Sequence, residues 1–138
     1  MCNNNAQSVS IGVDVVEVAR LERALLGGES SFISSFFAES EIRYATGKLR
    51  PAVPFAGIFA AKEAVYKALQ LPWNRAFSWK WIELTHNEIG VPVVAFSESF
   101  VTAWPEHRCR SVSVSITHSA DIAVAVAVAS LDSPPAMT

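Results

Sequence analysis

The sequence predicts an α+β fold in a single domain, with an antiparallel sheet of hairpins packed around one long helix. Helical patterns gather in the first half of the chain and two hairpin patterns follow in the second half, whereas a doubly wound fold alternates strands and helices. The length of 138 residues corresponds to one domain. Apolar residues make up 51% of the chain, which is enough to fill one core.

The first element is predicted as a strand, because residues 9–15 alternate aliphatic side chains at odd positions with small or polar ones at even positions. We expect the aliphatic side chains to face the core and Asp14 to face away from it. Apolar residues at helical spacing then predict a helix over residues 18–26, and Gly27 with Gly28 supplies its end.

Three helical or loop segments complete the first half. Residues 30–48 predict one or two short helices with a break near Ala38. Pro51 and Pro54 predict a loop, because proline lacks the backbone donor and restricts the preceding residue. Residues 55–69 carry apolar side chains at helical spacing and several alanines, which predicts the long helix.

Two hairpins follow. Strands are predicted at residues 81–86 and 91–96, with Pro92 at the start or edge of the second strand. Residues 97–104 predict a short helix.

The second hairpin comprises residues 112–117 and 122–129, and the alanines that alternate in its last strand indicate that a helix packs closely against them. The folded domain is therefore predicted to span residues 8–131. The polar ends, residues 1–7 and 132–138, are predicted to be flexible tails.

The composition excludes several classes of protein. The 11 basic and 13 acidic residues give a net charge of −2, so we expect no nucleic-acid partner, which would require a basic excess. We also expect no membrane partner, because the apolar run at residues 122–129 is far shorter than the roughly 20 residues of a membrane helix. The polar start of the sequence lacks a secretory pattern, and Cys2 and Cys109 lack zinc-site spacing, so we expect a cytoplasmic protein with free thiols.

Three charged residues are candidates for chemistry. Glu63 and Lys67 lie one turn apart on one face of the long helix, where the ordinary interpretation is a surface ion pair. Asp14 is unusual in an apolar strand and either caps the following helix or converges with Glu63. In the second case two carboxylates with waters would suit Mg²⁺, which often shares its remaining positions with phosphates.

The histidines differ in their context. His118 ends a strand at the mouth of the second hairpin, where it either bonds the turn backbone or serves a site. His86 and His107 have no such context and are predicted to be surface residues.

Four segments in order resemble the signatures of holo-acyl-carrier-protein synthases, which are 4′-phosphopantetheinyl transferases. They are GVDVVEVAR at residues 12–20, FAAKEAVYKAL at 59–69, GVP at 90–92 and VSITHS at 114–119. The second motif is specific alone, and the others are specific as an ordered set.

The resemblance implies a reaction. Asp14 and Glu63 would hold Mg²⁺ against the pyrophosphate of coenzyme A, and Lys67 would add positive charge there. A serine of an apo acyl carrier protein attacks the β-phosphorus, the phosphopantetheine arm is transferred and 3′,5′-ADP leaves. Either Glu63 or a water is the general base, and no residue of the chain acts as nucleophile.

The resemblance also implies a nucleotide pocket and an assembly. Ser115, Thr117 and His118 would line the nucleotide side, and Gly90 with Pro92 would form the backbone turn beside the adenine. Members of the family are usually homotrimers with sites between subunits, so His118 would serve the Asp14 and Glu63 of a neighbouring copy.

Two arginines are predicted to face the carrier protein. Arg20 matches a carrier-contacting arginine of the family, and Arg23 would extend its cationic patch, which suits an acidic partner.

The chain departs from the family pattern at two positions. Ile58 and Val91 stand where relatives carry side chains able to contact phosphate or nucleotide, and Arg50 with Lys48 would supply replacement charge. We therefore predict an active enzyme with altered affinity for coenzyme A. The alternatives are a non-catalytic subunit that binds carrier proteins and a Mg²⁺-dependent nucleotide pyrophosphatase.

Overall fold

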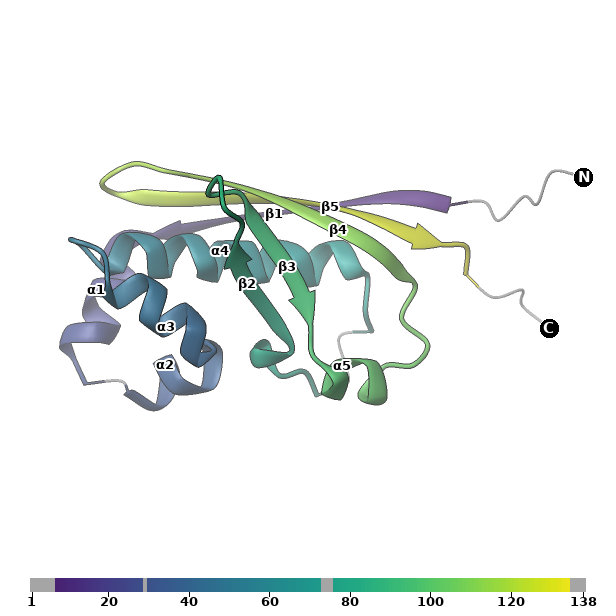
Figure 1. Cartoon of the computed structure of the whole chain (residues 1–138), viewed down its shortest axis with the longest axis horizontal. Coiled ribbons are helices and arrows are strands. Elements are labelled where there is room, and N and C mark those ends of the chain that lie inside the picture. The colour runs from purple at the N-terminus through teal and green to yellow at the C-terminus, as the bar shows by residue number, and fades with distance from the viewer. Residues whose placement is uncertain (1–6, 29, 73–75, 135–138) are drawn as a thin grey trace, which may run out of the picture.

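The computed structural model describes residues 7–28, 30–72 and 76–134 and has the predicted α+β architecture (Figure 1). Its elements, in chain order, are β1 (Gln7–Glu17), α1 (Val18–Leu26), α2 (Ser30–Phe36), α3 (Glu39–Thr46), α4 (Ala52–Leu69), the 3₁₀ turn η1 (Trp79–Trp81), β2 (Ile82–His86), β3 (Pro92–Phe96), α5 (Glu98–Ala103), β4 (Cys109–His118) and β5 (Ile122–Asp132). No helix within these described ranges is both long and apolar enough to cross a bilayer.

The strands form two antiparallel sheets. One sheet has the order β1-β5-β4, so the first strand pairs with the last, and the other consists of the β2–β3 hairpin. Helix α4 lies against the three-stranded sheet, while α1 to α3 and the β2–β3 hairpin cover the side of α4 that faces away from that sheet (Figure 1). The antiparallel hairpins and the long central helix are thus confirmed.

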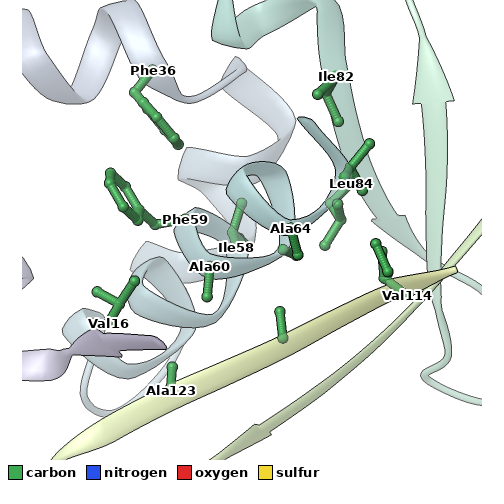
Figure 2. Packing of buried hydrophobic residues seen from close by; sticks show 14 of the residues in the cluster. Val16, Phe36, Ile58, Phe59, Ala60, Ala64, Ile82, Leu84, Val114 and Ala123 are labelled. Carbon is green, nitrogen blue, oxygen red and sulfur yellow. The ribbon is translucent and has the colours of Figure 1, made fainter. Parts of the chain in front are cut away.

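The contact between α4 and the sheet is close because small residues meet there. Ala123, Ala125, Ala127 and Ala129 of β5 are fully buried, as their alternation predicted. In Figure 2, Ala60 and Ala64 of α4 lie on the side of the helix nearest this strand, while large side chains pack on the other side. A β-carbon added to Gly12 of β1 would lie 1.9 Å from the carbonyl oxygen of Ala64. Glycine at this position therefore allows the backbones of strand and helix to touch.

The predicted facing of β1 is wrong. Val9, Ile11, Val13 and Val15 are 73%, 67%, 51% and 60% exposed, whereas Ser10 is 5% exposed. The reason is that α4 packs on the even positions of the strand, and at Gly12 its backbone comes so close that no side chain fits. Asp14 therefore faces α4, and no described residue of this chain covers the aliphatic face of the sheet.

The prediction of a loop at residues 50–54 is wrong for its second part, because α4 already begins at Ala52. Pro54 lies in the first turn, where a backbone N–H has no intrahelical partner, so proline is tolerated there. The break near Ala38 is confirmed between α2 and α3, and Pro92 begins β3.

The two ends of the domain extend the sheet. Gln7 and Asp132 pair with each other as the outermost residues of β1 and β5. Of the other predicted tail residues, 133 and 134 are described, whereas 1–6 and 135–138, and with them Cys2, lie outside the described residues. Cys109 carries a free thiol.

Candidate functional site

Asp14 of β1 meets the middle of α4. The ammonium group of Lys67 donates to the carbonyl oxygen of Val13 at 2.8 Å and to Asp14 Oδ1 at 3.3 Å. The side chain of Asp14 is only 18% exposed. The N-cap of α1 is Glu17, and no side chain caps this helix. The helix-capping interpretation of Asp14 is therefore wrong, and Asp14 is part of a cluster with residues of α4.

Glu63 completes this cluster one helical turn before Lys67. Burial and the negative charge of Asp14 raise the pKa of the Glu63 carboxyl, while Lys67 and Arg20 act in the opposite direction. Two carboxylates that repel each other in a half-buried site favour a bound cation.

The donor set of this cluster fits Mg²⁺. Among the described residues, no group of three or more histidine, cysteine or acidic side chains could enclose a metal. A pair of carboxylates is the donor set for an ion that keeps waters and shares positions with substrate phosphates, as Mg²⁺ commonly does.

Arg20 lies at the exposed side of the same cluster. Its guanidinium group stacks over the ring of Phe59 at 4.9 Å from the centroid and is close enough to Glu63 to affect its titration. Arg23, one turn further along α1, is also exposed. Both predicted arginines are therefore available to a partner.

A pocket of about 500 Å³ opens between α3, the start of α4, the β2–β3 hairpin and the end of β4. It is lined by Tyr44, Lys48, Arg50, Val53, Pro54, Gly57, Ile58, His86, Gly90, Pro92, Ile116 and His118. Among these described residues four are basic or histidine side chains and none is acidic. An apolar floor with a cationic rim suits a base and its phosphates.

The wall of this pocket includes a stacked ring pair that the sequence analysis did not find. The rings of Tyr44 and His86 lie 4.1 Å apart at an angle of 15°, and Lys48 Nζ lies 4.7 Å from the Tyr44 centroid. Burial and the nearby Lys48 lower the pKa of His86. The signal that could have indicated His86 is its position at the end of a strand just before the Gly90-Val91-Pro92 motif.

The prediction that His86 and His107 are surface residues is wrong for both, since each is partly buried. His86 packs on Tyr44 of α3. His107 packs against Phe100 of α5, with 5.0 Å between the ring centroids. The contact of His86 with Tyr44 joins elements that are distant in sequence, so local sequence context could not indicate it. The contact of His107 with Phe100 is local, since the two residues are close in sequence.

Arg50 lines the pocket and also ties its rim to two other elements. The guanidinium group donates to Glu22 Oε1 of α1 at 2.8 and 2.6 Å and to the carbonyl oxygen of Ala120 at 2.8 Å. These bonds fix its position at the edge of the pocket.

The predicted nucleotide-contacting residues divide into two groups. Gly90, with a positive φ of 82°, Pro92 and His118 line the pocket. Ser115 and Thr117 are exposed and do not line it, because side chains alternate along β4 and the pocket takes Ile116 and His118 from the other face of the strand.

The two positions where the chain departs from the family pattern also differ in the structure. Ile58 is 2% exposed and forms part of the pocket wall, so no charge enters the pocket at that position. Val91 is 45% exposed and is absent from the pocket lining, although both of its neighbours contribute to it.

The carboxylate cluster and the pocket lie on opposite flanks of α4. Asp14 and Ile116 are both register partners of Ala125, which is buried beneath α4, so they lie on the same face of the sheet about 10 Å apart. At about 100° per residue, Glu63 is also turned by about 180° around α4 from Pro54. One chain therefore carries the carboxylate cluster and the pocket on two sides of its central helix.

Comparisons with known proteins agree with these features. Residues 10–127 match the family model of the 4′-phosphopantetheinyl transferase superfamily. A holo-[acyl-carrier-protein] synthase of Chlorobaculum parvum is 38% identical over 87% of this chain and 97% of its own length. The crystal structure of the Helicobacter pylori enzyme in complex with coenzyme A has a TM-score of 0.73 at 32% identity, over 86% of this chain and 98% of the other. The Bacillus anthracis enzyme, in complex with CoA (3′,5′-ADP), gives 0.72 at 31% identity, over 92% and 100%.

Proposed function

Because the chain belongs to the 4′-phosphopantetheinyl transferase superfamily, we propose that it transfers the 4′-phosphopantetheine arm of coenzyme A to a serine of an apo acyl carrier protein. The observation that carries this proposal is the convergence of Asp14, Glu63 and Lys67, two acids and one base, from a strand and a helix that are distant in sequence. The cationic pocket on the other flank of α4 supports it, since coenzyme A carries a base, a ribose phosphate and a pyrophosphate.

Asp14 and Glu63 are the residues that would hold Mg²⁺, which when bound neutralises negative charge on phosphate oxygens. Lys67 donates to Val13 and Asp14, which leaves one N–H group of its ammonium to stabilise charge that develops during transfer. The serine oxygen forms a bond to the β-phosphorus as the bond from that phosphorus to the bridging oxygen breaks, and 3′,5′-ADP leaves with that oxygen.

The serine proton needs an acceptor. Glu63 would accept it, because burial and the charge of Asp14 raise the pKa of this carboxyl above its ordinary value. Positioning and charge neutralisation supply the remaining rate acceleration, so the chain needs no nucleophile of its own.

The active assembly is a homotrimer with sites between subunits. Two observations support this part of the proposal. The carboxylate cluster and the pocket, which would be the two half-sites of each shared site, lie on opposite flanks of α4. The aliphatic face of β1 with Val126 and Val128 of β5 is exposed in the single chain. A neighbouring copy would cover this face, and its His118 would serve the Asp14 and Glu63 of this chain. The free thiol of Cys109 suits the reducing cytoplasm that we propose as the location.

The test is intact-mass analysis of an apo acyl carrier protein after incubation with this protein, coenzyme A and Mg²⁺. We expect a mass gain of one phosphopantetheine arm, which is lost with EDTA and with Asp14→Ala. Binding of coenzyme A without any gain on several carriers would instead indicate the non-catalytic subunit. Cleavage of coenzyme A in the absence of carrier would indicate the nucleotide pyrophosphatase.

A further inference from the structure

A buried ion pair lies at the junction of five elements and has no part in the mechanism above. Lys62 of α4 and Glu41 of α3 are 0% and 1% exposed and their charged groups are in contact. Lys62 Nζ also donates to the carbonyl oxygens of Phe36 at the end of α2, at 2.8 Å, and of Trp79 in η1, at 3.2 Å. All the donors of this ammonium group are therefore used inside the fold.

Glu41 extends the network into the β2–β3 hairpin. Its Oε1 accepts from the backbone N–H of Ala38 at 2.7 Å, and its Oε2 accepts from the backbone N–H of Leu84 at 2.9 Å. A second bond runs in parallel, from Ser40 Oγ to Glu83 Oε1 at 2.6 Å. Adjacent residues of α3 thus hold adjacent residues of β2.

The elements joined in this way are those that carry the stacked rings of the pocket wall. Tyr44 lies three residues after Glu41, on the same face of α3, and His86 lies two residues after Leu84, on the same face of β2. The 4.1 Å stacking of Tyr44 on His86 requires α3 and β2 to keep a fixed spacing. The hydrogen bond between Glu41 and Leu84 sets the spacing of α3 and β2 one helical turn before Tyr44. Lys62 fixes both elements relative to α4, which forms the pocket floor.

We propose that Glu41 and Lys62 are positioning residues for coenzyme A binding, which act by holding the Tyr44–His86 wall against the floor of the pocket. This inference rests on the proposed function for its ligand. Removal of the pair should weaken the binding of coenzyme A and leave the transfer step at saturating coenzyme A intact, because Asp14, Glu63 and Lys67 lie on the other flank of α4.

The test compares wild type with the double variant Glu41→Gln/Lys62→Met, which removes both charges together, because loss of one partner would leave a buried charge unpaired. We expect the Kd of coenzyme A, measured on the folded protein by calorimetry, to rise about tenfold, as for other residues that orient a binding group. We expect kcat at saturating coenzyme A to stay within about twofold. In NMR spectra, the His86 ring protons should lose the shift that the stacked Tyr44 ring causes.

Leu131→Ala is the matched control, because it truncates a fully buried side chain of β5 outside the pocket lining. It should lower the melting temperature without changing the Kd or the His86 signals. An unchanged Kd in the folded double variant, or an equal rise in the control, would overturn the proposal. If the double variant does not fold, the variant Ser40→Ala replaces it, because this variant removes the second bond between α3 and β2. A rise in the Kd of coenzyme A of less than tenfold supports the proposal, and an unchanged Kd overturns it. Failure of the wild type to bind coenzyme A would refute the proposed function, while the His86 signals would still test the positioning role.

Discussion

The substitution Gly12→Ala should move Glu63 and Lys67 away from Asp14. The size of this movement follows from the packing of α4 on β1. The new β-carbon would lie 1.9 Å from the carbonyl oxygen of Ala64 and 2.9 Å from the backbone nitrogen of Ala68. Carbon atoms do not approach a backbone oxygen to less than 3.0 Å, so the helix must retreat by at least 1.1 Å, from 1.9 to 3.0 Å. Lys67 and Glu63 travel with the helix, whereas Asp14 stays on the strand.

Two effects are expected. Overpacking at a backbone contact should lower the free energy of unfolding by about 3 kcal/mol, the upper end of the usual range. Displacement of the cluster by about 1 Å should lower kcat/KM for transfer to the carrier about 10²-fold.

The assay is carrier mass gain with time, beside thermal denaturation of the same samples. The matched control is Gly47→Ala, since Gly47 caps α3 with right-handed helical angles and lies far from the cluster in sequence. The control should retain the activity of the wild type. If Gly12→Ala had the stability and kcat/KM of the wild type, the close backbone contact would be refuted as the feature that positions Asp14.

Three further outcomes follow from the same geometry. The pKa of Glu63 is raised in the folded chain, so its contribution to stability is present at low pH and lost as the pH rises through that pKa. In the absence of metal, the melting temperature of Glu63→Gln should therefore lie above that of wild type at pH 8, and the difference should shrink at pH 5. A larger difference at pH 5 than at pH 8 would contradict this. Lys67→Met should lower the transfer rate by about 10²- to 10³-fold with little change in melting temperature, because its side chain is half exposed. Ile11→Glu should convert the proposed homotrimer of 15.0 kDa chains into a monomer by light scattering, and an unchanged mass would exclude the β1 face as the interface.

The alternation in β1 shows how far a sequence pattern determines a structure. Period-two alternation predicted the strand correctly, but it does not indicate which face of the strand packs against the rest of the same chain. Aliphatic residues were assigned inward because burial of apolar surface is the usual driving force. The side that α4 covers was instead selected by size, since Gly12 is small enough for backbone contact. A monomer sequence cannot distinguish a core face from a face that another copy covers.

In the candidate site, too, residues in local sequence motifs could be predicted, whereas residues brought together only by packing could not. Asp14, Glu63, Lys67 and His118 could be predicted as site residues because each stands in a recognisable local motif. Tyr44 has no such motif, and its role in the pocket arises from the distance between α3 and β2, which the buried Glu41 controls. Contacts across elements distant in sequence depend on packing, which no local pattern encodes.

The two flanks of α4 yield a prediction that separates a shared site from a site within one chain. Asp14→Ala damages the carboxylate half-site and His118→Ala the pocket half-site, so each variant alone should have little activity. If both halves came from one chain, co-refolding the two variants would restore nothing, since every chain carries a defect. If each site takes Asp14 from one copy and His118 from the next, random mixing in equal amounts should restore about one quarter of the wild-type sites, because each half is intact with a probability of about one half. Recovery measured by carrier mass gain, against each variant refolded alone, decides between the two arrangements; activity at the level of the separate variants would refute the shared site.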